Sequence, residues 1–346
     1  MNYSLPLPTQ KYEVLVRCFT FNQSRFIQDA LNGFVIQQTT FPYVCLVMDD
    51  ASTDGEQEVI KKYLSRECDM SSATYYENEL SACIRVPHLT NVNCTFFVCL
   101  LKKNLYRETG RKIKLLEPWR KACKYEALCE GDDLWTDCCK LQKQYDALEN
   151  DALSSFVYTG FNVIDESGNV LEKNPFAKRL SESHSGVLFF DLLVNMNYIM
   201  TLTTFFRIEV LLENDPFYYD YGIFLSASRQ GRGLYLPDIT ACYRINPASI
   251  MNTNPDSLLP FLYRIVLIEI NKSLYNKKTS LLVSQNKMHK SVVGYIIARY
   301  INRSLIRQDY FSYLVSHPSL WLYAIKGGLI RMFCDSAFRE HVRQMK

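Results

Sequence analysis

Residues 43–54 read Tyr43-Val44-Cys45-Leu46-Val47-Met48-Asp49-Asp50-Ala51-Ser52-Thr53-Asp54. The first six side chains form an unbroken apolar run, which is typical of a strand buried on both faces of a parallel sheet. Upstream, residues 12–18 have the composition of another strand, and residues 24–34 carry apolar side chains at helical spacing. A helix is expected to follow over residues 56–64. This order predicts the βαβ unit of an α/β nucleotide-binding domain, whose ligands bind beyond the carboxyl ends of the strands.

Acidic side chains follow two separate strands of the predicted sheet. The first cluster is Asp49, Asp50 and Asp54, and the second is Glu130, Asp132 and Asp133 around a glycine turn. Because carboxylates repel one another, gathering them at one sheet edge requires cations or hydrogen-bond donors. A Mg²⁺ or Mn²⁺ ion that bridges a diphosphate meets this need, since both metals prefer hard oxygen ligands. The alternative is that each cluster is a solvated turn, with Asp50 or Asp54 serving as a helix cap.

The remaining pattern predicts further elements less directly. We expect helices over residues 94–105 and 220–228, strands over residues 155–163, 201–207 and 239–244, and a hairpin turn at residues 165–169. The first strand is not followed by Gly-x-Gly-x-x-Gly or by a P-loop, which argues against a dinucleotide oxidoreductase. The chain therefore needs another way to hold its nucleotide.

Composition limits the class of protein. Apolar residues make up 48% and charged residues 22% of the 346 residues, which excludes a disordered chain. A net charge of +3 does not favour nucleic-acid binding. The twelve cysteines lie mainly in apolar segments, so we expect reduced thiols. No apolar run reaches about 18 residues and no signal peptide is recognised, so the expected location is the cytoplasm.

Three motifs together resemble a known family. They are Thr20-Phe21-Asn22 after the first strand, the Asp49–Asp54 run, and Glu130-Gly131-Asp132-Asp133-Leu134-Trp135 followed by Lys140-Leu141-Gln142-Lys143-Gln144. Over residues 12–246 the chain resembles a family 2 glycosyltransferase of the GT-A fold, especially the bacterial enzymes of capsular and cell-surface polysaccharide synthesis. This resemblance implies a Rossmann-like, mixed and mostly parallel sheet flanked by helices.

The resemblance assigns a role to each motif residue. Thr20, Asn22, Asp49, Asp50, Asp54, Glu130, Asp132 and Arg244 would bind the nucleotide-sugar, Asp133 with help from Asp132 would hold Mn²⁺ or Mg²⁺, and Asp220 would be the catalytic base. The sequence departs from the family at three places. Glu130 replaces the first Asp of the acidic motif, Cys138-Cys139 replaces a proline and a small residue, and Asn246 replaces a histidine. Asp215 competes with Asp220, which could instead be a helix N-cap.

The function implied by the resemblance is an inverting, metal-dependent, hexosyltransferase-like transfer. A sugar would move from a nucleotide-diphospho-sugar, with UDP as the favoured nucleotide, to a saccharide or lipid-linked acceptor. The alternative is a catalytically inactive GT-A-like subunit that binds or assembles a polysaccharide-synthesising complex. A nucleotidylyltransferase is disfavoured because its Gly-rich basic loop is missing.

The carboxyl-terminal hundred residues differ in character. We predict a catalytic domain over residues 1–250, with a nucleotide-sugar half at 12–135 and an acceptor half at 136–250, and a helical region over 251–346. Residues 247–346 carry 14 Lys and Arg against 5 Asp and Glu. These basic helices could lie peripherally on an anionic membrane, on the inner face of the cytoplasmic membrane, or pack as a cap on the catalytic domain. The oligomeric state is left open.

Overall fold

The computed structural model describes residues 5–8, 10–106, 109–178, 199–212 and 220–247. The chain divides into two compact units, Met1–Gly186 with Tyr198–Ala248 and Val187–Asn197 with Ser249–Lys346. Every described residue belongs to the first unit. The predicted helical region 251–346 and Asp215 lie outside the described residues, so the domain boundary at 250 stays a prediction.

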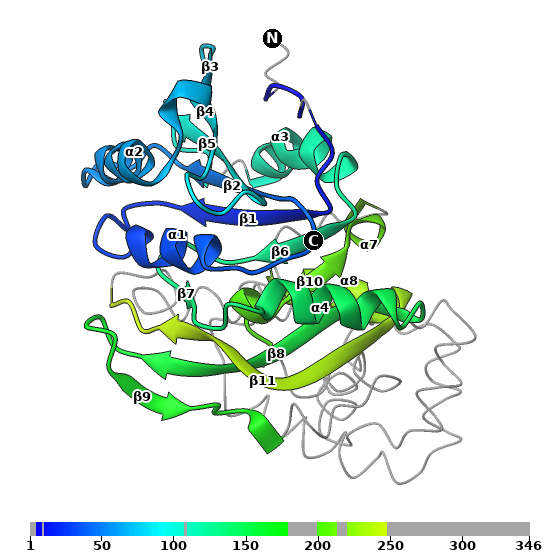
Figure 1. The fold of residues 1–346 in the computed structure, drawn as a ribbon. Coiled ribbons are helices and arrows are strands. Elements are labelled where there is room, and N and C mark those ends of the chain that lie inside the picture. The colour runs from blue at the N-terminus through cyan, green and yellow to red at the C-terminus, as the bar shows by residue number, and fades with distance from the viewer. Residues whose placement is uncertain (1–4, 9, 107–108, 179–198, 213–219, 248–346) are drawn as a thin grey trace, which may run out of the picture. The chain divides into compact units, whose positions relative to one another are not determined.

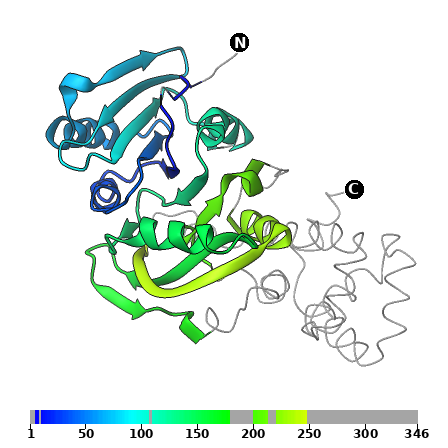
Figure 2. The same ribbon diagram turned by 45° about the vertical axis from the view of Figure 1, so that its right-hand side comes forward.

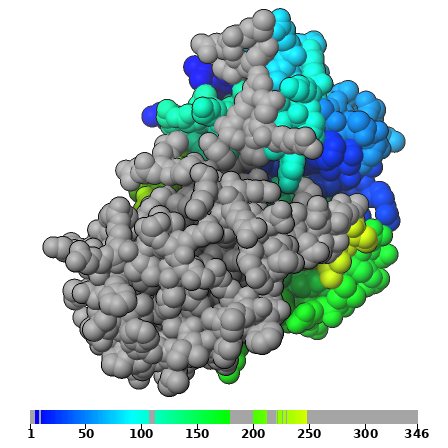
Figure 3. Space-filling view, turned by 180° about the vertical axis from the view of Figure 1, so that it is seen from behind, coloured from blue at the N-terminus to red at the C-terminus, as the bar shows by residue number. Residues whose placement is uncertain are grey.

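The first unit is built on one eleven-stranded sheet. Its strands are β1 Val14–Thr20, β2 Tyr43–Asp49, β3 Thr74–Glu77, β4 Ser81–Pro87, β5 Cys94–Leu101, β6 Tyr125–Leu128, β7 Leu134–Trp135, β8 Ser154–Ile164, β9 Val170–Lys173, β10 Phe205–Arg207 and β11 Arg232–Arg244. Their order is β3-β4-β5-β2-β1-β6-β10-β8-β11-β7, and β9 pairs with β8. Space-filling atoms of the β3–β5 segment and of β8 and β9 lie at opposite ends of the coloured surface (Figure 3).

The sheet is mixed, as predicted. Strands β5, β2, β1 and β6 run parallel to one another, and so do β8 and β11. The other six described pairings are antiparallel, and most of them are short. Antiparallel strands therefore extend the sheet on both sides of the parallel β5-β2-β1-β6 run.

Helices cover both faces of this sheet (Figures 1 and 2). They are α1 Ile27–Val35, α2 Glu56–Glu67, α3 Thr109–Lys121, α4 Lys140–Glu149, α7 Ile208–Leu212 and α8 Asp220–Gln230, with short 3-10 turns η1 Met70–Ser72 and η3 Thr201–Thr203. Helices α1, α2 and α4 share one apolar core with the sheet. Helix α3 packs on the opposite face, through residues such as Trp119. The α/β class is thereby confirmed, and among the described helices none is long and apolar enough to span a bilayer.

Residues 94–105 correct the sequence prediction. Cys94–Leu101 forms strand β5, not a helix, and all eight of its residues are buried. It pairs in parallel with β2 and antiparallel with β4, so it lies inside the sheet. A strand buried on both faces has no polar side to mark its period, and its apolar run therefore looks like that of a buried helix.

The Lys140–Gln144 motif explains how helix α4 is fixed to the sheet. Lys140 is fully buried, with Nζ 2.5 Å from the side-chain oxygen of Gln144 and 4.8 Å from the ring centroid of Trp135. Gln144 in turn donates to the carbonyl of Thr203 at 2.8 Å, and the Trp135 indole donates to the carbonyl of Leu202 at 2.9 Å. The motif therefore ties α4 and β7 to the turn before β10.

Lys140→Met is expected to stabilise the protein by about 1–4 kcal/mol at pH 7, the range seen when buried charges give way to apolar side chains. Burial lowers the pKa of Lys140 to about 7. In the unfolded chain Lys140 stays protonated up to about pH 10. Between pH 7 and about pH 10 the unfolded state therefore binds one proton more than the folded state, and the stability of the wild type rises with pH. Urea unfolding at pH 7 and pH 9 should show a smaller rise in the variant.

The control for this measurement is Lys143→Met on the same helix. Hydrogen bonds from Lys143 to Asp137 and Asp238 raise its pKa, so its removal should leave the pH 7–9 slope unchanged. An unchanged slope in Lys140→Met would contradict the assignment of that slope to Lys140.

Candidate functional site

The acidic clusters meet at one edge of the sheet. Strands β1, β2 and β6 run parallel, so their carboxyl ends point the same way (Figure 1). The loops that follow β1 and β2 are joined directly, because the backbone nitrogen of Asp50 donates to the carbonyl of Thr20 at 3.0 Å. The loop after β6 joins them through Gly131, whose nitrogen donates to the carbonyl of Phe19 at 3.2 Å. This edge is where open α/β sheets bind their ligands.

Glu56 organises the loops after β1 and β2, although no sequence motif distinguishes it. Its carboxylate is fully buried and accepts from the hydroxyl of Thr20, the backbone nitrogen of Gln23 at 2.9 Å and the hydroxyl of Ser52 at 2.8 Å. Burial raises the pKa of Glu56, and these three donors counter the rise. Thr20, a predicted nucleotide ligand, therefore has its hydroxyl committed to the protein.

Asn22 and Asp54 also hold these two loops together. Asn22 adopts a positive φ of 54°, and its side-chain oxygen accepts from the backbone nitrogen of Thr53 at 2.8 Å. Asp54 accepts from the backbone nitrogens of Ser24 at 2.9 Å and Glu56 at 3.1 Å. The N-cap of α2 is Gly55, without a side-chain cap bond, so the alternative that Asp54 caps this helix is wrong.

Asp49 and Asp50 are buried at the end of β2. Asp49 is fully buried, and Oδ1 accepts from Gln57 at 2.5 Å, whereas Oδ2 is buried without a hydrogen-bond partner. Asp50 is 3% exposed, and accepts from the backbone nitrogen of Leu105 at 2.6 Å and from Lys112 Nζ at 2.8 Å. Lys112 therefore brings a cation to this acidic edge, which meets the need for compensation.

The Glu130–Asp133 loop presents its three carboxylates in different ways. Asp133 is 2% exposed, and Oδ1 accepts from the backbone nitrogen of Arg244 at 2.9 Å. Asp132 is half-buried and accepts from Asn246 at 3.1 Å. Glu130 is half-buried too. Asp132 and Glu130 are thus the carboxylates that a ligand can reach, whereas Asp133 holds β11 against the loop.

The electrostatics of the loop show which groups surround it. Burial raises the pKa of Glu130 to about 8, with Asp220 and Asp132 raising it further while Arg17 and Lys112 oppose the shift. Burial also raises the pKa of Asp132 and of Asp133. Such crowding of partly desolvated carboxylates marks a place that favours a bound cation.

Asp220 is brought to the same site from a distant part of the chain. It lies in the first turn of α8, and desolvation raises its pKa while Arg17 lowers it. The charge of Asp220 in turn raises the pKa of Glu130. A carboxylate with a raised pKa is suited to accept a proton.

Two further residues of this region were missed from the sequence. Arg17 lies on β1, is 3% exposed, and has Nε 3.5 Å from a carboxylate oxygen of Glu126. Tyr243 is half-buried, and its pKa is raised to about 12 by burial together with Asp133, Asp132 and Asp220. The pattern of apolar and polar residues along a strand shows that an Arg is present. It does not show whether the guanidinium lies beside the ligand or in an ion pair elsewhere.

Arg244 joins three segments of the chain. Its side chain is 2% exposed, and its guanidinium donates to the carbonyls of Asp132 at 2.9 Å and Glu166 at 3.0 Å and to the carboxylate of Asp29 at 2.7 Å. It also lies 4.8 Å from the ring centroid of Phe26. Arg244 therefore holds the acidic loop, the β8–β9 turn and α1 together, and its contact with a diphosphate stays a prediction.

The acidic loop fits a divalent metal that shares its ligands with a substrate. Among the described residues, one group of three possible metal ligands has its atoms within 4.8 Å of one another, and it is Asp137, Cys138 and Cys139. The three carboxylates of the acidic loop do not form such a group, so a metal there would need further ligands. Mg²⁺ binds through one or two carboxylates plus phosphate oxygens and water. Asp132, with Glu130 beside it, meets that requirement.

Comparisons place the chain near several known proteins. No family model matches it. It is 28% identical over 229 residues to Uncharacterized protein Rv1520 of Mycobacterium tuberculosis (strain ATCC 25618 / H37Rv), and equally to Uncharacterized protein Mb1547 of Mycobacterium bovis. Each match covers 65% of this chain and 56% of the relative, so the chain spans about half the length of the curated relatives it matches.

Solved structures are similar at lower identity. S. aureus TarS 1-349 in complex with UDP-GlcNAc has a TM-score of 0.49 and 16% identity, covering 75% of this chain and 66% of that chain. Mannosyltransferase PcManGT from Pyrobaculum calidifontis in complex with GDP-Man and Mn2+ has a TM-score of 0.42 and 13% identity, covering 94% and 89%.

Proposed function

We propose that this chain is an inverting glycosyltransferase of the GT-A fold that transfers a sugar from a nucleotide-diphospho-sugar, with UDP as the expected nucleotide. The observation that carries the proposal is that hydrogen bonds join the loops after β1, β2 and β6 at one edge of the sheet, where Glu130 and Asp132 lie. Asp220 follows more than 80 positions later in the sequence and raises the pKa of Glu130, whereas Arg17 and Lys112 lower it.

In the proposed site, Asp132 and Glu130 hold the divalent cation, and Asp133 keeps the loop closed on β11 through its bond to the Arg244 nitrogen. The bound Mn²⁺ or Mg²⁺ would neutralise charge on the departing diphosphate. The Glu56-centred loops, with Thr20, Asn22 and Asp54, give the nucleotide pocket a fixed backbone. Asp49 and Asp50 support that backbone through hydrogen bonds to neighbouring protein groups and do not contact the donor directly.

Asp220 is the proposed general base. It would take the proton of the acceptor hydroxyl as the acceptor oxygen attacks the anomeric carbon from the face opposite the nucleotide. Its raised pKa sets the pH dependence: the protonated carboxyl cannot accept a proton, so transfer should fall as pH drops through that pKa. Arg17 lowers the same pKa and so favours the ionised carboxylate that accepts the proton.

The acceptor and cellular place belong to the same proposal. The family resemblance favours a saccharide or lipid-linked acceptor in surface polysaccharide synthesis. The basic charge of residues 251–346 favours a cytoplasmic protein that touches an anionic membrane through this region.

Asp220→Asn is expected to keep donor binding and to lose transfer by about 10²–10⁴-fold, the usual worth of a general base. Thermal shift with UDP-, GDP-, dTDP- and CMP-sugars, with and without Mn²⁺, first identifies the donor. Release of the nucleotide from that donor, with a saccharide acceptor present, then measures transfer in wild type and variant.

The matched control is Asp238→Asn, which removes a carboxylate of β11 that forms an ion pair with Lys143. Near-normal transfer by Asp220→Asn would remove Asp220 from the mechanism. Donor binding by the wild type without turnover under any acceptor would instead support the inactive binding subunit.

A further inference from the structure

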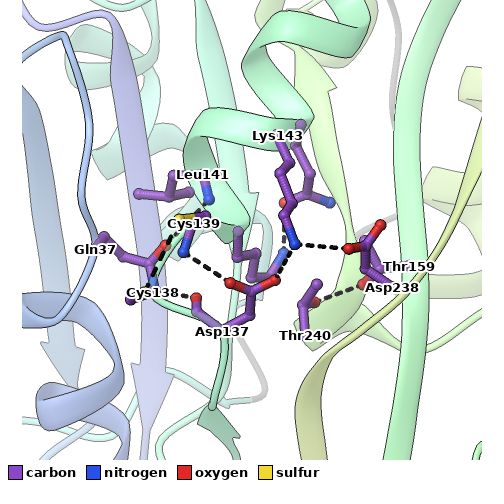
Figure 4. Close-up of polar contacts among 11 residues, drawn as sticks. Gln37, Asp137, Cys138, Cys139, Leu141, Lys143, Thr159, Asp238 and Thr240 are labelled. Atoms are coloured by element: carbon purple, nitrogen blue, oxygen red, sulfur yellow. Dashed lines mark hydrogen bonds and ion pairs between the residues drawn. The ribbon is translucent and has the colours of Figure 1, made fainter.

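Two neighbouring thiols lie in the turn between β7 and α4, outside the acidic loop (Figure 4). Cys138 and Cys139 are only half-buried, whereas eight of the eleven described cysteines are buried and Cys123 is the other half-buried one. Their Sγ atoms are 3.9 Å apart. A carboxylate oxygen of Asp137 joins them, and the three atoms all lie within 4.8 Å of one another.

This spacing matches the coordination of a metal by sulfur. Zinc binds thiolates at about 2.3 Å in tetrahedral geometry, so two sulfur ligands are about 3.8 Å apart. The two Sγ atoms are already 3.9 Å apart. Soft sulfur donors select zinc-like cations, whereas Mg²⁺ and Mn²⁺ prefer the oxygen ligands of the acidic loop.

The backbone that carries the three ligands is held in place by the segment that follows helix α1. Gln37, 1% exposed, donates to the carbonyl of Asp137 at 2.9 Å and accepts from the backbone nitrogen of Leu141 at 3.1 Å. The backbone nitrogen of Gln38 donates to the carbonyl of Cys138 at 2.7 Å. Figure 4 shows Gln37 reaching into the turn. The ligands therefore need little rearrangement to converge.

Asp137 keeps the capacity to serve as the third ligand. Its Oδ1 accepts from the backbone nitrogen of Cys139 at 2.8 Å, and its Oδ2 accepts from Lys143 Nζ at 2.7 Å. Each carboxylate oxygen can accept two bonds, so a lone pair remains on each. Lys143 is also held by Asp238 at 2.6 Å, so it has a second anionic partner if a metal competes for Asp137.

We propose that Asp137, Cys138 and Cys139 form a binding site for a thiophilic divalent cation such as zinc, separate from the Mn²⁺ or Mg²⁺ of the donor site. Both thiols release their protons to solvent as the two metal–sulfur bonds form, and no electron is transferred. Three protein ligands leave the fourth position to water. The proposal stands whether or not the chain is a glycosyltransferase.

The test uses the full-length, metal-free, reduced protein and Cd²⁺ as a spectroscopic probe. We expect one equivalent of Cd²⁺ to give a thiolate charge-transfer band, and Zn²⁺ to compete for it. Cys138→Ser with Cys139→Ser should lose the band, and Asp137→Asn should bind about tenfold or more weakly. The matched control Cys123→Ser should bind as the wild type does.

A second measurement needs no variant. Zn²⁺ should protect Cys138 and Cys139 of the wild type from alkylation, read by peptide mass spectrometry, while Cys123 is modified at an unchanged rate. The proposal is overturned if Zn²⁺ leaves that alkylation unaltered, or if the folded double variant keeps the one-equivalent band.

Discussion

Asp132→Asn is expected to abolish Mn²⁺-dependent donor binding, weakening it by at least about 100-fold, while leaving the fold intact. Asp132 is a half-buried carboxylate of the acidic loop, and its side chain accepts a hydrogen bond from Asn246 at 3.1 Å. An asparagine can still accept that bond, but it removes the negative charge that a hard cation requires. Calorimetry of the donor with and without Mn²⁺ measures the loss.

Asp133→Asn is the matched comparison, because it changes the adjacent residue by the same atom. Asp133 is 2% exposed and accepts from the Arg244 nitrogen, so the variant should keep its metal dependence. We expect the two variants to differ in donor binding at equal melting temperature. If Asp133→Asn alone lost metal-dependent binding, the direct ligand would be Asp133, as the family resemblance implied.

The sequence predicted the parallel half of the fold because its signals there are local. The apolar run before Asp49 gave strand β2 as predicted, and the Asp165–Asn169 turn forms the β8–β9 hairpin. Helix α8 begins at Asp220, as expected. Strand β2 is buried at all seven positions, but Pro42 and Asp49-Asp50 bound its apolar run. Strand β5 is buried just as fully, and its sequence predicts a helix because an apolar run without a polar side does not distinguish the two.

The candidate site was predicted by residue type and not by role. The sequence identifies Asp133 and Arg244 as charged residues beside the acidic motif, but it does not show which atoms are occupied by backbone groups. The bond from the Arg244 nitrogen to Asp133 joins residues 111 positions apart. Glu56 was overlooked for the same reason, since its three donors come from the β1 and β2 loops.

The clusters are nonetheless linked by a simple physical requirement. Carboxylates that follow parallel strands must lie at one edge, and their repulsion must be compensated there. Lys112 pairs with Asp50, and Arg17 lowers the pKa of both Glu130 and Asp220. In the proposed site, a bound cation would compensate the charge of Asp132.

Among Gly→Ala substitutions at the glycines that the structure describes, Gly131→Ala is expected to disrupt the acidic loop most. An added Cβ would lie 2.2 Å from Thr20 Oγ1 and 2.6 Å from Gln23 Oε1. Thr20 cannot withdraw easily, because it is 3% exposed and its hydroxyl is bonded to the buried Glu56. The loop must therefore move away from β1. We expect a loss of about 1–3 kcal/mol of stability, typical of overpacking, and a fall in donor affinity of about 100-fold.

Gly168→Ala separates this close approach from a general effect of losing a glycine. Gly168 has a φ of 87° in the β8–β9 turn, and an added Cβ there meets no atom within 4 Å. It should cost about 1 kcal/mol through backbone strain and leave donor binding unchanged. Urea unfolding and donor calorimetry on both variants decide the matter. Wild-type affinity in Gly131→Ala would mean that donor binding does not require the loop to lie against Thr20, and the site would have to be sought away from the β1 edge.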